Sequence, residues 1–231
     1  MDLGQRSNQL ELLDKDDIPA SDLYKNLNEL HTINSLLGGY EVVLKGLSKL
    51  LKDDSRVYRI LDIGSGGGDT LKEIYKRFGS KYKLELIGVD LKTECIDYAR
   101  KNVEGLPIKF IRSDYRDIIN GGDQFDIIIT NLFCHHLVDK DLIFLFSWMK
   151  RNAAVGCVIN DLHRHSLAYY SIKWLTTFFS KSYLVKNDAC LSVARGFSLK
   201  EIEYYLEAAM VRSYSIEWKW AFRWLIIIEN E

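Results

Sequence analysis

The sequence is poor in proline, with 2 residues in a chain of 231, and it has no proline- or serine-rich linker, internal repeat or low-complexity tract. A chain of this length and composition predicts one domain with a sizeable core rather than tethered units. The four cysteines are widely spaced and form no C-x-x-C pair. They predict neither a zinc site nor a disulfide framework, so we expect buried thiols in a reducing compartment and no bound metal.

A long apolar run and an excess of either charge are also missing. No stretch of about 18 apolar residues occurs, which argues against stable membrane insertion. Residues 1–6 carry no apolar signal segment, and we expect a cytoplasmic protein. The 31 Lys and Arg residues nearly balance the 32 Asp and Glu residues. The chain therefore lacks the basic excess that indicates nucleic-acid binding.

A glycine-rich segment is the most informative feature that is present. Residues 59–69 read as a short apolar strand, the acidic Asp62, and a turn with Gly64, Gly66 and Gly68 that leads into a helix. Glycine serves where the backbone takes positive φ or approaches a ligand closely. Free N–H groups at the start of the helix point back toward the turn. This turn is therefore expected to hold a small ligand.

The charges around the turn distinguish between two ligand classes that share such a loop. A dinucleotide site has the pattern G-x-G-x-x-G or G-x-G-x-x-A. Here Gly68 is followed by Asp69, whose carboxylate would repel a pyrophosphate. Asp62 suits a ligand with a positive group, and S-adenosylmethionine (SAM) has an ammonium, a sulfonium and a single carboxylate. We therefore favour SAM over a dinucleotide and over a plain strand-to-helix turn.

Three further strands end near polar residues. Residues 84–90 form an apolar strand ending in Asp90, whose carboxylate can accept both ribose hydroxyls of an adenosine. Capping of the next helix is a compatible role. A strand at 108–112 precedes Asp114, and a strand at 125–130 leads into the polar loop 131–137. Open α/β sheets bind ligands along this carboxyl edge.

In this order and spacing, the motifs resemble those of the class I SAM-dependent methyltransferases, from about Val57 to the carboxyl terminus. The resemblance implies an α/β fold with a doubly wound, mostly parallel seven-stranded sheet, the Rossmann-like methyltransferase fold. It also implies that Asp114 accepts from the adenine amino group, the alternative being a solvated loop residue. The cofactor-binding residues predicted on these grounds are Asp62, Gly64, Ser65, Gly66, Gly68, Asp90, Leu91, Asp114, Tyr115 and Asn131.

Two adjacent histidines follow the fourth strand. Histidine is the side chain best suited to proton transfer near neutral pH. His135 and His136 lie in the segment that the resemblance places beside the methionine end of SAM and the methyl acceptor. We expect one of them to act as base or orienting group. The alternative is that His-His-Leu starts a helix or packs.

The amino-terminal part, residues 1–53, is predicted to be helical. Apolar residues recur at spacings of three and four between Leu30 and Leu51, with a break at Gly38-Gly39. This part would form a lid over the cofactor mouth or pack on the flank of the sheet. The candidate lid residues, which could instead belong to a partly ordered terminus, are Arg6, Glu11 and Asp14.

The remainder is predicted as three parts of the same single domain, residues 1–231. Residues 54–161 alternate strand and helix, which predicts a parallel SAM-binding core whose fifth strand spans 156–160. Residues 162–197 form a helical insertion after that strand. Residues 198–231 supply a helix with a capping box and a terminal strand hairpin, the last strand of which joins the sheet antiparallel.

The insertion is expected to select the substrate. One helical face carries Leu167, Tyr170, Trp174, Leu175 and Phe178. This face would either line an apolar pocket beside the acceptor or pack on the body of the domain. A membrane-surface role is less favoured, because the polar face carries few Lys or Arg residues.

Two motifs flank this helix. The segments Asp161-Leu-His-Arg164 and Leu191-Ser-Val-Ala-Arg195 resemble a subgroup of small-molecule methyltransferases that includes enzymes acting on phenolic and polyketide-type lipids. Arg164 and Arg195 are therefore candidates for binding an acidic substrate group, and pairing with Asp161 is the alternative. The predicted substrate-binding residues are Arg164, Tyr170, Trp174 and Arg195.

These features predict SAM-dependent methyl transfer to a small hydrophobic or aromatic acceptor. O-methylation of a phenolic or polyketide/lipid hydroxyl is the first choice. The alternatives are C-methylation of a quinol-like ring, a non-enzymatic SAM-binding partner protein and, more weakly, a nicotinamide oxidoreductase. The expected partner is a small molecule. A homodimer through Trp218, Trp220 and Trp224 also stays open.

Overall fold

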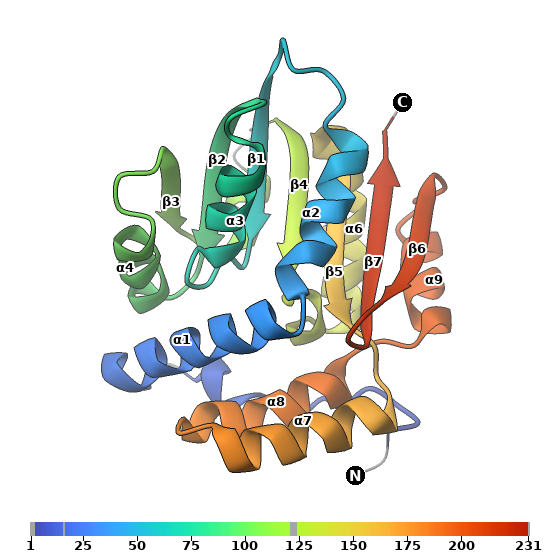
Figure 1. Ribbon diagram of the computed structural model, residues 1–231. Coiled ribbons are helices and arrows are strands. Elements are labelled where there is room, and N and C mark those ends of the chain that lie inside the picture. The colour runs from blue at the N-terminus through green and yellow to red at the C-terminus, as the bar shows by residue number, and fades with distance from the viewer. Residues whose placement is uncertain (1–2, 16, 121–123, 231) are drawn as a thin grey trace.

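A seven-stranded sheet forms the centre of the computed structural model, which describes residues 3–15, 17–120 and 124–230 (Figure 1). The strand order is β3-β2-β1-β4-β5-β7-β6. The strands are β1 (Val57–Ile63), β2 (Lys83–Asp90), β3 (Ile108–Arg112), β4 (Phe125–Asn131), β5 (Ala153–Leu162), β6 (Tyr214–Lys219) and β7 (Arg223–Glu229). Strands β1 to β5 are parallel, and β7 lies antiparallel between β5 and β6. The predicted α/β fold is confirmed.

The strand patterns explain this arrangement. In strand β4, Phe125 and the three isoleucines 127–129 are buried, so the strand is covered on both sides of the sheet, as expected for a central parallel strand. Strand β7 is likewise buried from Arg223 to Ile228, because it lies between two other strands. Strand β5 begins at Ala153, three residues before its predicted start, since Ala153 pairs with Phe125 ahead of a register shift.

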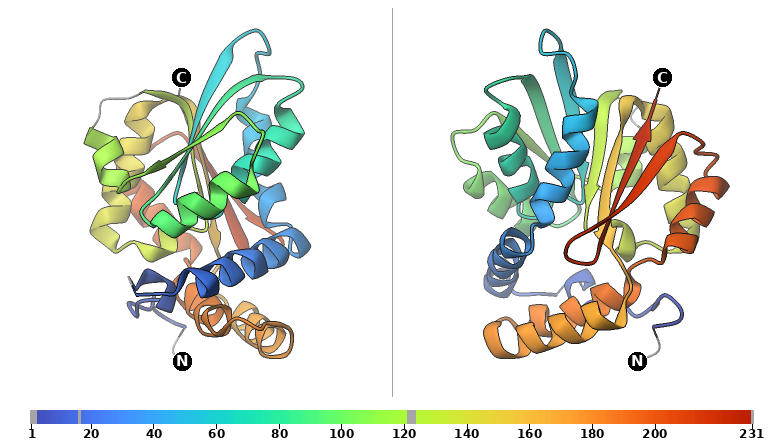
Figure 2. Two further views of the ribbon diagram at one scale, coloured as in Figure 1. Left: turned by 90° about the vertical axis from the view of Figure 1, so that its left-hand side faces the viewer. Right: turned by 45° about the vertical axis from the view of Figure 1, so that its right-hand side comes forward.

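Helices cover both faces of the sheet (Figure 2). Their bounds are α2 (Gly39–Leu50), α3 (Asp69–Phe78), α4 (Thr93–Asn102), α5 (Tyr115–Asn120), α6 (Asp139–Asn152) and α9 (Leu199–Ala208). Residues of α2, α3 and α4 share one buried cluster with the sheet, whereas residues of α6 and α9 belong to the cluster on the other face. The predicted capping box of α9 is present, with Ser198 and Glu201 bonding each other's backbone N–H groups.

A separate layer lies below the carboxyl ends of β1 to β5 (Figures 1 and 2). It contains the short 3-10 helix η1 (Leu12–Asp14) and the helices α1 (Ala20–Leu36), α7 (Ser166–Phe179) and α8 (Tyr183–Arg195). Gly38 has a φ of +69°, and it separates α1 from α2 at the predicted break. The insertion contains a second helix, α8, which the sequence pattern did not indicate.

Two expectations from composition bear on this fold. The four cysteines are buried and free, as expected. In the part of the chain that the structure describes, every helix is too short or too polar to cross a membrane.

Candidate functional site

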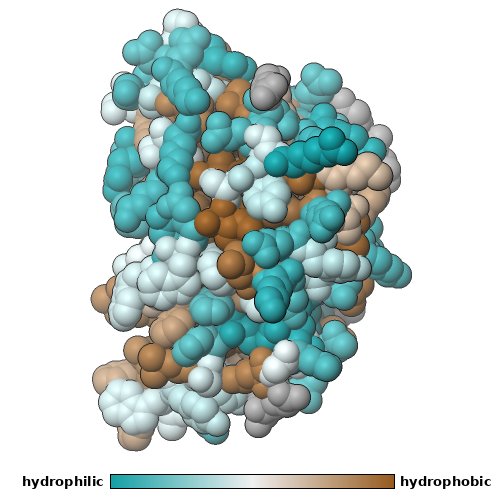
Figure 3. Space-filling model, turned by 90° about the vertical axis from the view of Figure 1, so that its right-hand side faces the viewer, coloured by the Kyte–Doolittle hydropathy of each residue, from teal (hydrophilic) through white to brown (hydrophobic). Residues whose placement is uncertain are grey.

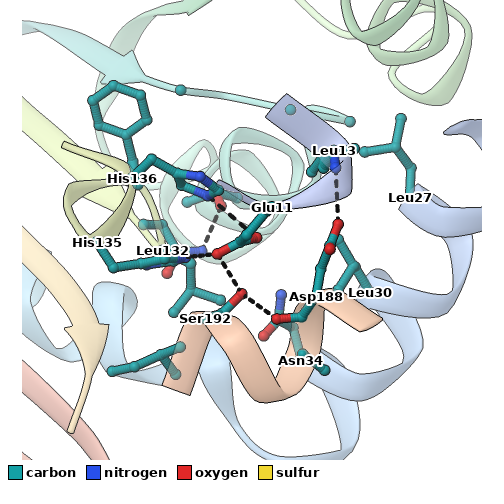
Figure 4. A pocket seen from close by; sticks show the side chains of 18 of the residues that line it. Glu11, Leu13, Leu27, Leu30, Asn34, Leu132, His135, His136, Asp188 and Ser192 are labelled. Carbon is teal, nitrogen blue, oxygen red and sulfur yellow. Dashed lines mark hydrogen bonds and ion pairs between the residues drawn. The ribbon is translucent and has the colours of Figure 1, made fainter. Parts of the chain in front are cut away.

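A cavity of about 690 Å³ opens between the carboxyl edge of the sheet and the layer of α1, α7 and α8. Such a volume is in the range of small-molecule sites. Its upper wall is formed by the glycine turn after β1 and by the ends of β2 and β4, and its lower wall by helices of the layer. Figure 4 shows one side of this cavity, where residues from η1, α8 and the loop after β4 converge.

The glycine turn can exist only without side chains at two of its positions. Gly64 has a φ of +73°, and a Cβ there would lie 2.3 Å from a ring carbon of Phe133. Gly68 has a φ of +77°, and its Cβ would lie 2.7 Å from Phe110. L-residues rarely adopt this region of φ, and bare backbone is what allows a ligand to approach closely. The turn is therefore shaped by its glycines.

Asp90 lies in the cavity wall at the end of β2. One carboxylate oxygen accepts from the N–H of Gly66 at 2.9 Å, and the other accepts from the N–H of Lys92 at 3.0 Å. Burial raises the pKa of Asp90, although these two hydrogen bonds offset part of the effect. A carboxylate has about four lone-pair sites. Asp90 thus fixes the glycine turn and keeps acceptor capacity for hydroxyl groups of a ligand.

Asp62 lies behind the turn, and its side chain does not line the cavity. It is almost completely buried, and both carboxylate oxygens lack a hydrogen-bond partner among the described residues, as does the hydroxyl of Ser65. Burial and the nearby charge of Asp90 raise the pKa of Asp62 well above its ordinary range. Buried polar groups are normally paired. Asp62, predicted to bind the cofactor, therefore does not face the cavity, and it places acceptor oxygens that lack a described partner behind the glycine turn instead.

The other predicted cofactor residues are distributed along the same wall. Leu91, Asp114, Tyr115 and Asn131 line the cavity, whereas Gly68 only supports the turn. Asp114 accepts from the N–H of Arg116 at 2.8 Å. The side chain of Asn131 donates to Thr70 at 2.9 Å.

The two histidines lie at another part of the cavity, and a carboxylate holds each one. His135 Nδ1 lies 2.8 Å from Asp161 Oδ1, and His136 Nδ1 lies 3.0 Å from Asp14 Oδ1. The side chain of His135 is 3% exposed and that of His136 is 21% exposed. If each Nδ1 carries the proton toward its carboxylate, each Nε2 is left as an acceptor. His136 is the more accessible of the two.

Glu11, from the amino-terminal segment, lies between the two imidazoles (Figure 4). Its Oε1 lies 3.6 Å from His135 Nε2, and its Oε2 lies 4.0 Å from His136 Nε2. Ser192 of α8 donates to Oε1 at 2.9 Å. Burial raises the pKa of Glu11 from 4.5 to about 7, against a smaller opposing effect of His136. A carboxyl group with such a pKa can exchange a proton near neutral pH.

The carboxylates that bind the two histidines, Asp161 and Asp14, have lowered pKa values. Burial alone would raise the pKa of Asp161, but the charge and hydrogen bond of His135 hold it below its ordinary value. For Asp14, the hydrogen bond and charge of His136 likewise outweigh burial and lower the pKa. Asp14 and Asp161 therefore stay ionised and orient the imidazoles, while Glu11 is the carboxyl group that titrates.

Glu11, His135 and His136 could also hold a metal ion. Among the described residues, they form a group of three metal-binding side chains whose ligand atoms lie within 4.8 Å of one another. However, Arg195 Nε lies 3.9 Å from Glu11 Oε1, which places a fixed positive charge beside this group. The arrangement therefore suits a shared proton better than a divalent cation, and the absence of a metal stays a prediction.

Comparisons with known proteins place this geometry in a family. Residues 60–156 match a family model described as a methyltransferase domain. Cyclopropane-fatty-acyl-phospholipid synthase of Escherichia coli K12 is 32% identical over 94 residues, which are 41% of this chain and 23% of that protein. Ribosomal protein L11 methyltransferase of Dictyoglomus turgidum is 36% identical over 88 residues, 37% of this chain and 26% of that protein. The chain thus spans about a quarter of the length of these relatives.

Solved structures extend the likeness over nearly the whole chain. The plantazolicin methyltransferase BpumL, in complex with a triazolic desmethylPZN analog and SAH, has a TM-score of 0.66 at 19% identity, covering 92% of this chain and 90% of that chain. Human N-acetylserotonin methyltransferase, in complex with SAM, has a TM-score of 0.63 at 14% identity, covering 92% and 56%. Residues 60–156 thus match a methyltransferase domain, and the fold of the chain resembles that of solved SAM-dependent methyltransferases. The glycine turn and Asp90 fit SAM as the cofactor.

The two arginines predicted to bind substrate, Arg164 and Arg195, contact other parts of the chain instead. Arg195 is buried and donates to the carbonyl oxygens of His135 at 3.0 Å, His136 at 2.7 Å, and Gln9. Arg164 donates to the carbonyl of Gly196 at 2.6 Å and to Glu201 at 2.8 Å. Neither side chain lines the cavity, because backbone carbonyls and a carboxylate already occupy their donors. Their positions support a structural role, and neither arginine pairs with Asp161.

The predicted aromatic face of α7 also points away from the cavity. Tyr170 and Trp174 are both exposed and do not line it. The cavity is lined instead by Ala168 and Ile172, and by Leu175, which is the member of the predicted face that does point inward. The apolar spacing was correctly recognised, but the helix has apolar residues on two sides, and its inner side carries the smaller ones.

Several cavity residues of the domain had no signal in the sequence. Helix α1 contributes Asn26, Leu30 and Asn34, and α8 contributes Asp188 and Ser192. Asp188 accepts from the N–H groups of Leu12 at 2.8 Å and Leu13 at 2.9 Å, so it holds η1 against α8 (Figure 4). The motif around Leu191 to Arg195 marked this region, but nothing in it indicated contact with the amino-terminal segment.

The three tryptophans proposed for a dimer interface have different environments. Trp224 is buried and donates its indole N–H to the carbonyl of Phe197 at 2.9 Å. Trp218 and Trp220 are exposed, and Trp220 also lines the cavity. Trp224 is therefore not available for an interface, and dimerisation stays a prediction.

Proposed function

We propose that this protein transfers the methyl group of SAM to a hydroxyl oxygen of a small, largely apolar acceptor. The observation that carries the proposal is one cavity that joins the glycine turn and Asp90 to the group of Glu11, His135 and His136. A cofactor cradle and a proton-accepting group in one enclosed space are the two parts that such a transfer needs.

The lining favours an apolar acceptor. Between the two polar regions the wall carries Leu27, Leu30, Leu37, Phe133, Ile172 and Leu175. Pockets with mainly apolar walls and a few placed polar groups are typical of small-molecule sites. One relative is named a cyclopropane-fatty-acyl-phospholipid synthase, and a fatty acyl chain is apolar. A phenol or a lipid hydroxyl matches this lining.

His136 is assigned as the group that takes the acceptor proton. Asp14 holds Nδ1, so that Nε2 is oriented as the acceptor, and His136 is the more exposed of the two imidazoles. Glu11 lies 4.0 Å from Nε2 and stabilises the imidazolium that forms. A phenol has an ordinary pKa of about 10, so removal of its proton makes the oxygen a stronger nucleophile. His135 is a positioning residue, held by Asp161.

SAM, when bound, supplies an electrophilic methyl group on a sulfonium, which leaves as a neutral thioether. The chain's own residues align the acceptor, exclude water and accept the proton. Alignment of two bound reactants alone can contribute several orders of magnitude in rate. The amino-terminal segment completes this enclosure, because η1 is bonded to α8 through Asp188 and Arg6 donates to the carbonyl of Leu137 at 2.9 Å.

The test is methyl transfer from labelled SAM to a panel of phenols, polyketide lipids and quinols. We expect transfer to an apolar hydroxyl compound, and a loss of about 100-fold or more in kcat for His136→Gln, within the range for removal of a general base. His165→Asn is the matched control, because asparagine can replace the cap that His165 provides to the N–H of Leu167. SAM affinity measured by calorimetry shows that both variants remain folded.

Two results would overturn the proposal. Unchanged kcat in His136→Gln, with SAM bound normally, would remove His136 from the reaction. Heat of binding with NADH and none with SAM would remove methyl transfer altogether. Analysis of the product decides between oxygen and carbon: a methyl group on a ring carbon of a quinol would favour C-methylation, which can use the same base to form the phenolate.

A further inference from the structure

Helix α7 has an outer face that the methyl-transfer site does not use. It is formed by five large side chains that are between 59% and 72% exposed: Leu167, Tyr170, Trp174, Phe178 and Phe179. Four of them recur at spacings of three and four residues, so they form one stripe along the helix. In Figure 3, brown and pale side chains gather along the lower edge of the molecule, at the end where α7 and α8 lie.

The outer α7 face is continuous rather than a set of scattered residues. The ring of Trp174 lies 5.0 Å from that of Phe178 and 6.4 Å from that of Phe179. Tyr183, just beyond the helix, is also exposed. Contiguous exposed apolar surface on a protein normally marks an interaction site. Tryptophan and tyrosine, with an apolar body and a polar tip, are the residues enriched where protein meets the lipid headgroup region.

The segment that carries this face is basic. Residues 162–187 contain no Asp or Glu, although acidic residues slightly outnumber basic ones in the whole chain. Lys173, Lys181 and Lys186 are exposed within this segment. Acidic residues of other elements also touch the segment: the carboxylate of Glu29 is bonded to Ser180 and to the N–H of Lys181, and Asp22 lies at the hydroxyl of Tyr183. The face therefore presents aromatic rings flanked by free ammonium groups.

We propose that the outer α7 face docks on the surface of a membrane that contains anionic lipids. The aromatic rings enter the boundary between headgroups and acyl chains, and the lysines contact the negatively charged headgroups. An isologous contact with a second copy of the chain is disfavoured, because a two-fold axis through this face would bring like-charged lysines together. The inner side of α7 lines the cavity, so docking places the cavity beside the bilayer.

This inference goes beyond methyl transfer and does not depend on it. The membrane-surface role was less favoured from the sequence because the polar face of the helix carries few Lys or Arg residues, and the aromatic side chains were expected to line a pocket or to pack on the domain. The structure turns them outward, and the smaller residues Ala168, Ile172 and Leu175 take the inner position. An amphipathic helix of this kind binds at the interface and does not span it.

The experiment is sedimentation of the protein with vesicles of phosphatidylcholine, with and without phosphatidylserine. We expect binding to the vesicles with phosphatidylserine, weakened by added salt. The double variant Trp174→Ser/Phe178→Ser should lower the partition coefficient by at least tenfold. The matched control is Tyr204→Ser/Met210→Ser, which removes two equally exposed apolar side chains from the region of α9 and should bind as the parent does.

A lysine variant separates the contribution of charge to vesicle binding from that of the aromatic rings. Lys173→Gln/Lys186→Gln should reduce binding to phosphatidylserine vesicles and flatten its salt dependence, while leaving weak binding to neutral vesicles. Calorimetric SAM binding is expected to be unchanged in all these variants, which shows that they are folded and that SAM binding is separate from docking.

Two outcomes would overturn the proposal. In the first, the outer α7 face does not contribute to vesicle binding: either the parent does not bind, or Trp174→Ser/Phe178→Ser binds as well as the parent. In the second, the parent does not sediment with vesicles but forms a dimer that this variant abolishes. The second outcome would assign the face to another copy of the chain.

Discussion

Replacing Glu11 by glutamine tests two effects of this carboxyl group: the cost of its buried charge to the amino-terminal segment, and its contribution to methyl transfer. The carboxyl group is 3% exposed, and burial raises its pKa from 4.5 to about 7. Because one pH unit corresponds to about 1.36 kcal/mol, keeping Glu11 ionised at pH 8 costs the closed amino-terminal segment about 3 kcal/mol. The pKa is higher in the folded state than in the unfolded state. The cost is therefore absent below about pH 4.5 and grows as the pH rises to about 7.

Hydrogen exchange of the amides of Leu12 and Leu13 measures this cost locally. Both N–H groups donate to Asp188, so they exchange only when η1 leaves α8. At pH 8 these amides should exchange about 100-fold more slowly in Glu11→Gln than in the parent, since about 1.4 kcal/mol corresponds to a factor of ten. At pH 4.5 the two proteins should exchange at similar rates. Methyl transfer should fall in the variant, because glutamine cannot stabilise an imidazolium by charge.

The control is Asp17→Asn, which removes an exposed carboxylate of the same segment. It should leave the exchange of both amides unchanged at either pH. Equal exchange of the parent and Glu11→Gln at pH 8 would refute the reasoning, because it would mean that the ionised carboxylate is not destabilising in the closed segment. Faster exchange in the variant would refute it as well.

Three further perturbations address the cofactor and metal assignments. Gly64→Ala should weaken SAM binding at least tenfold in calorimetry. The control is Gly105→Ala, which should retain parental affinity, because Gly105 has a φ of +82° and no atom within 4 Å of the new Cβ. Equal effects of the two variants would show that backbone strain alone is responsible. SAM affinity should fall as the pH is lowered, beginning above the ordinary range of an aspartate, because the raised pKa of Asp62 favours its neutral form. Asp62→Asn should bind SAM more weakly and with a flatter pH profile, and parallel profiles would contradict this role. Treatment with a chelator should leave methyl transfer unchanged; loss of activity that zinc restores would instead make Glu11, His135 and His136 metal ligands.

Local motifs predicted several residues that line the glycine-turn end of the cavity. The glycine turn, Asp90 and Asn131 each follow an apolar strand directly, and the ends of parallel strands meet at one edge of the sheet. Their positions therefore depend on only a few neighbouring residues. The same reasoning placed His135 and His136 at the cavity, because they follow β4 closely.

The part of the cavity around Glu11 and the two histidines depends on contacts between distant residues, which no local pattern reveals. Ser192 and Glu11 are 181 positions apart, and Asp188 and Leu12 are 176 apart. The pattern of α7 identified a stripe but not its direction, since both sides of the helix carry apolar residues. Arg195 was a substrate candidate because its motif resembles that of a methyltransferase subgroup, and its carbonyl partners cannot be read from residue types.

Arg195 connects parts of the chain that fold from different regions of the sequence. Its guanidinium reaches the carbonyl groups of both histidines and of Gln9, while its own carbonyl accepts from Arg6 at 3.0 Å. The proton-accepting group is thus complete only when the terminal segment, the loop after β4 and the end of α8 are assembled together. Loss of any one of these three parts would therefore disturb the positions of Glu11 and both histidines, while leaving the glycine turn after β1 in place.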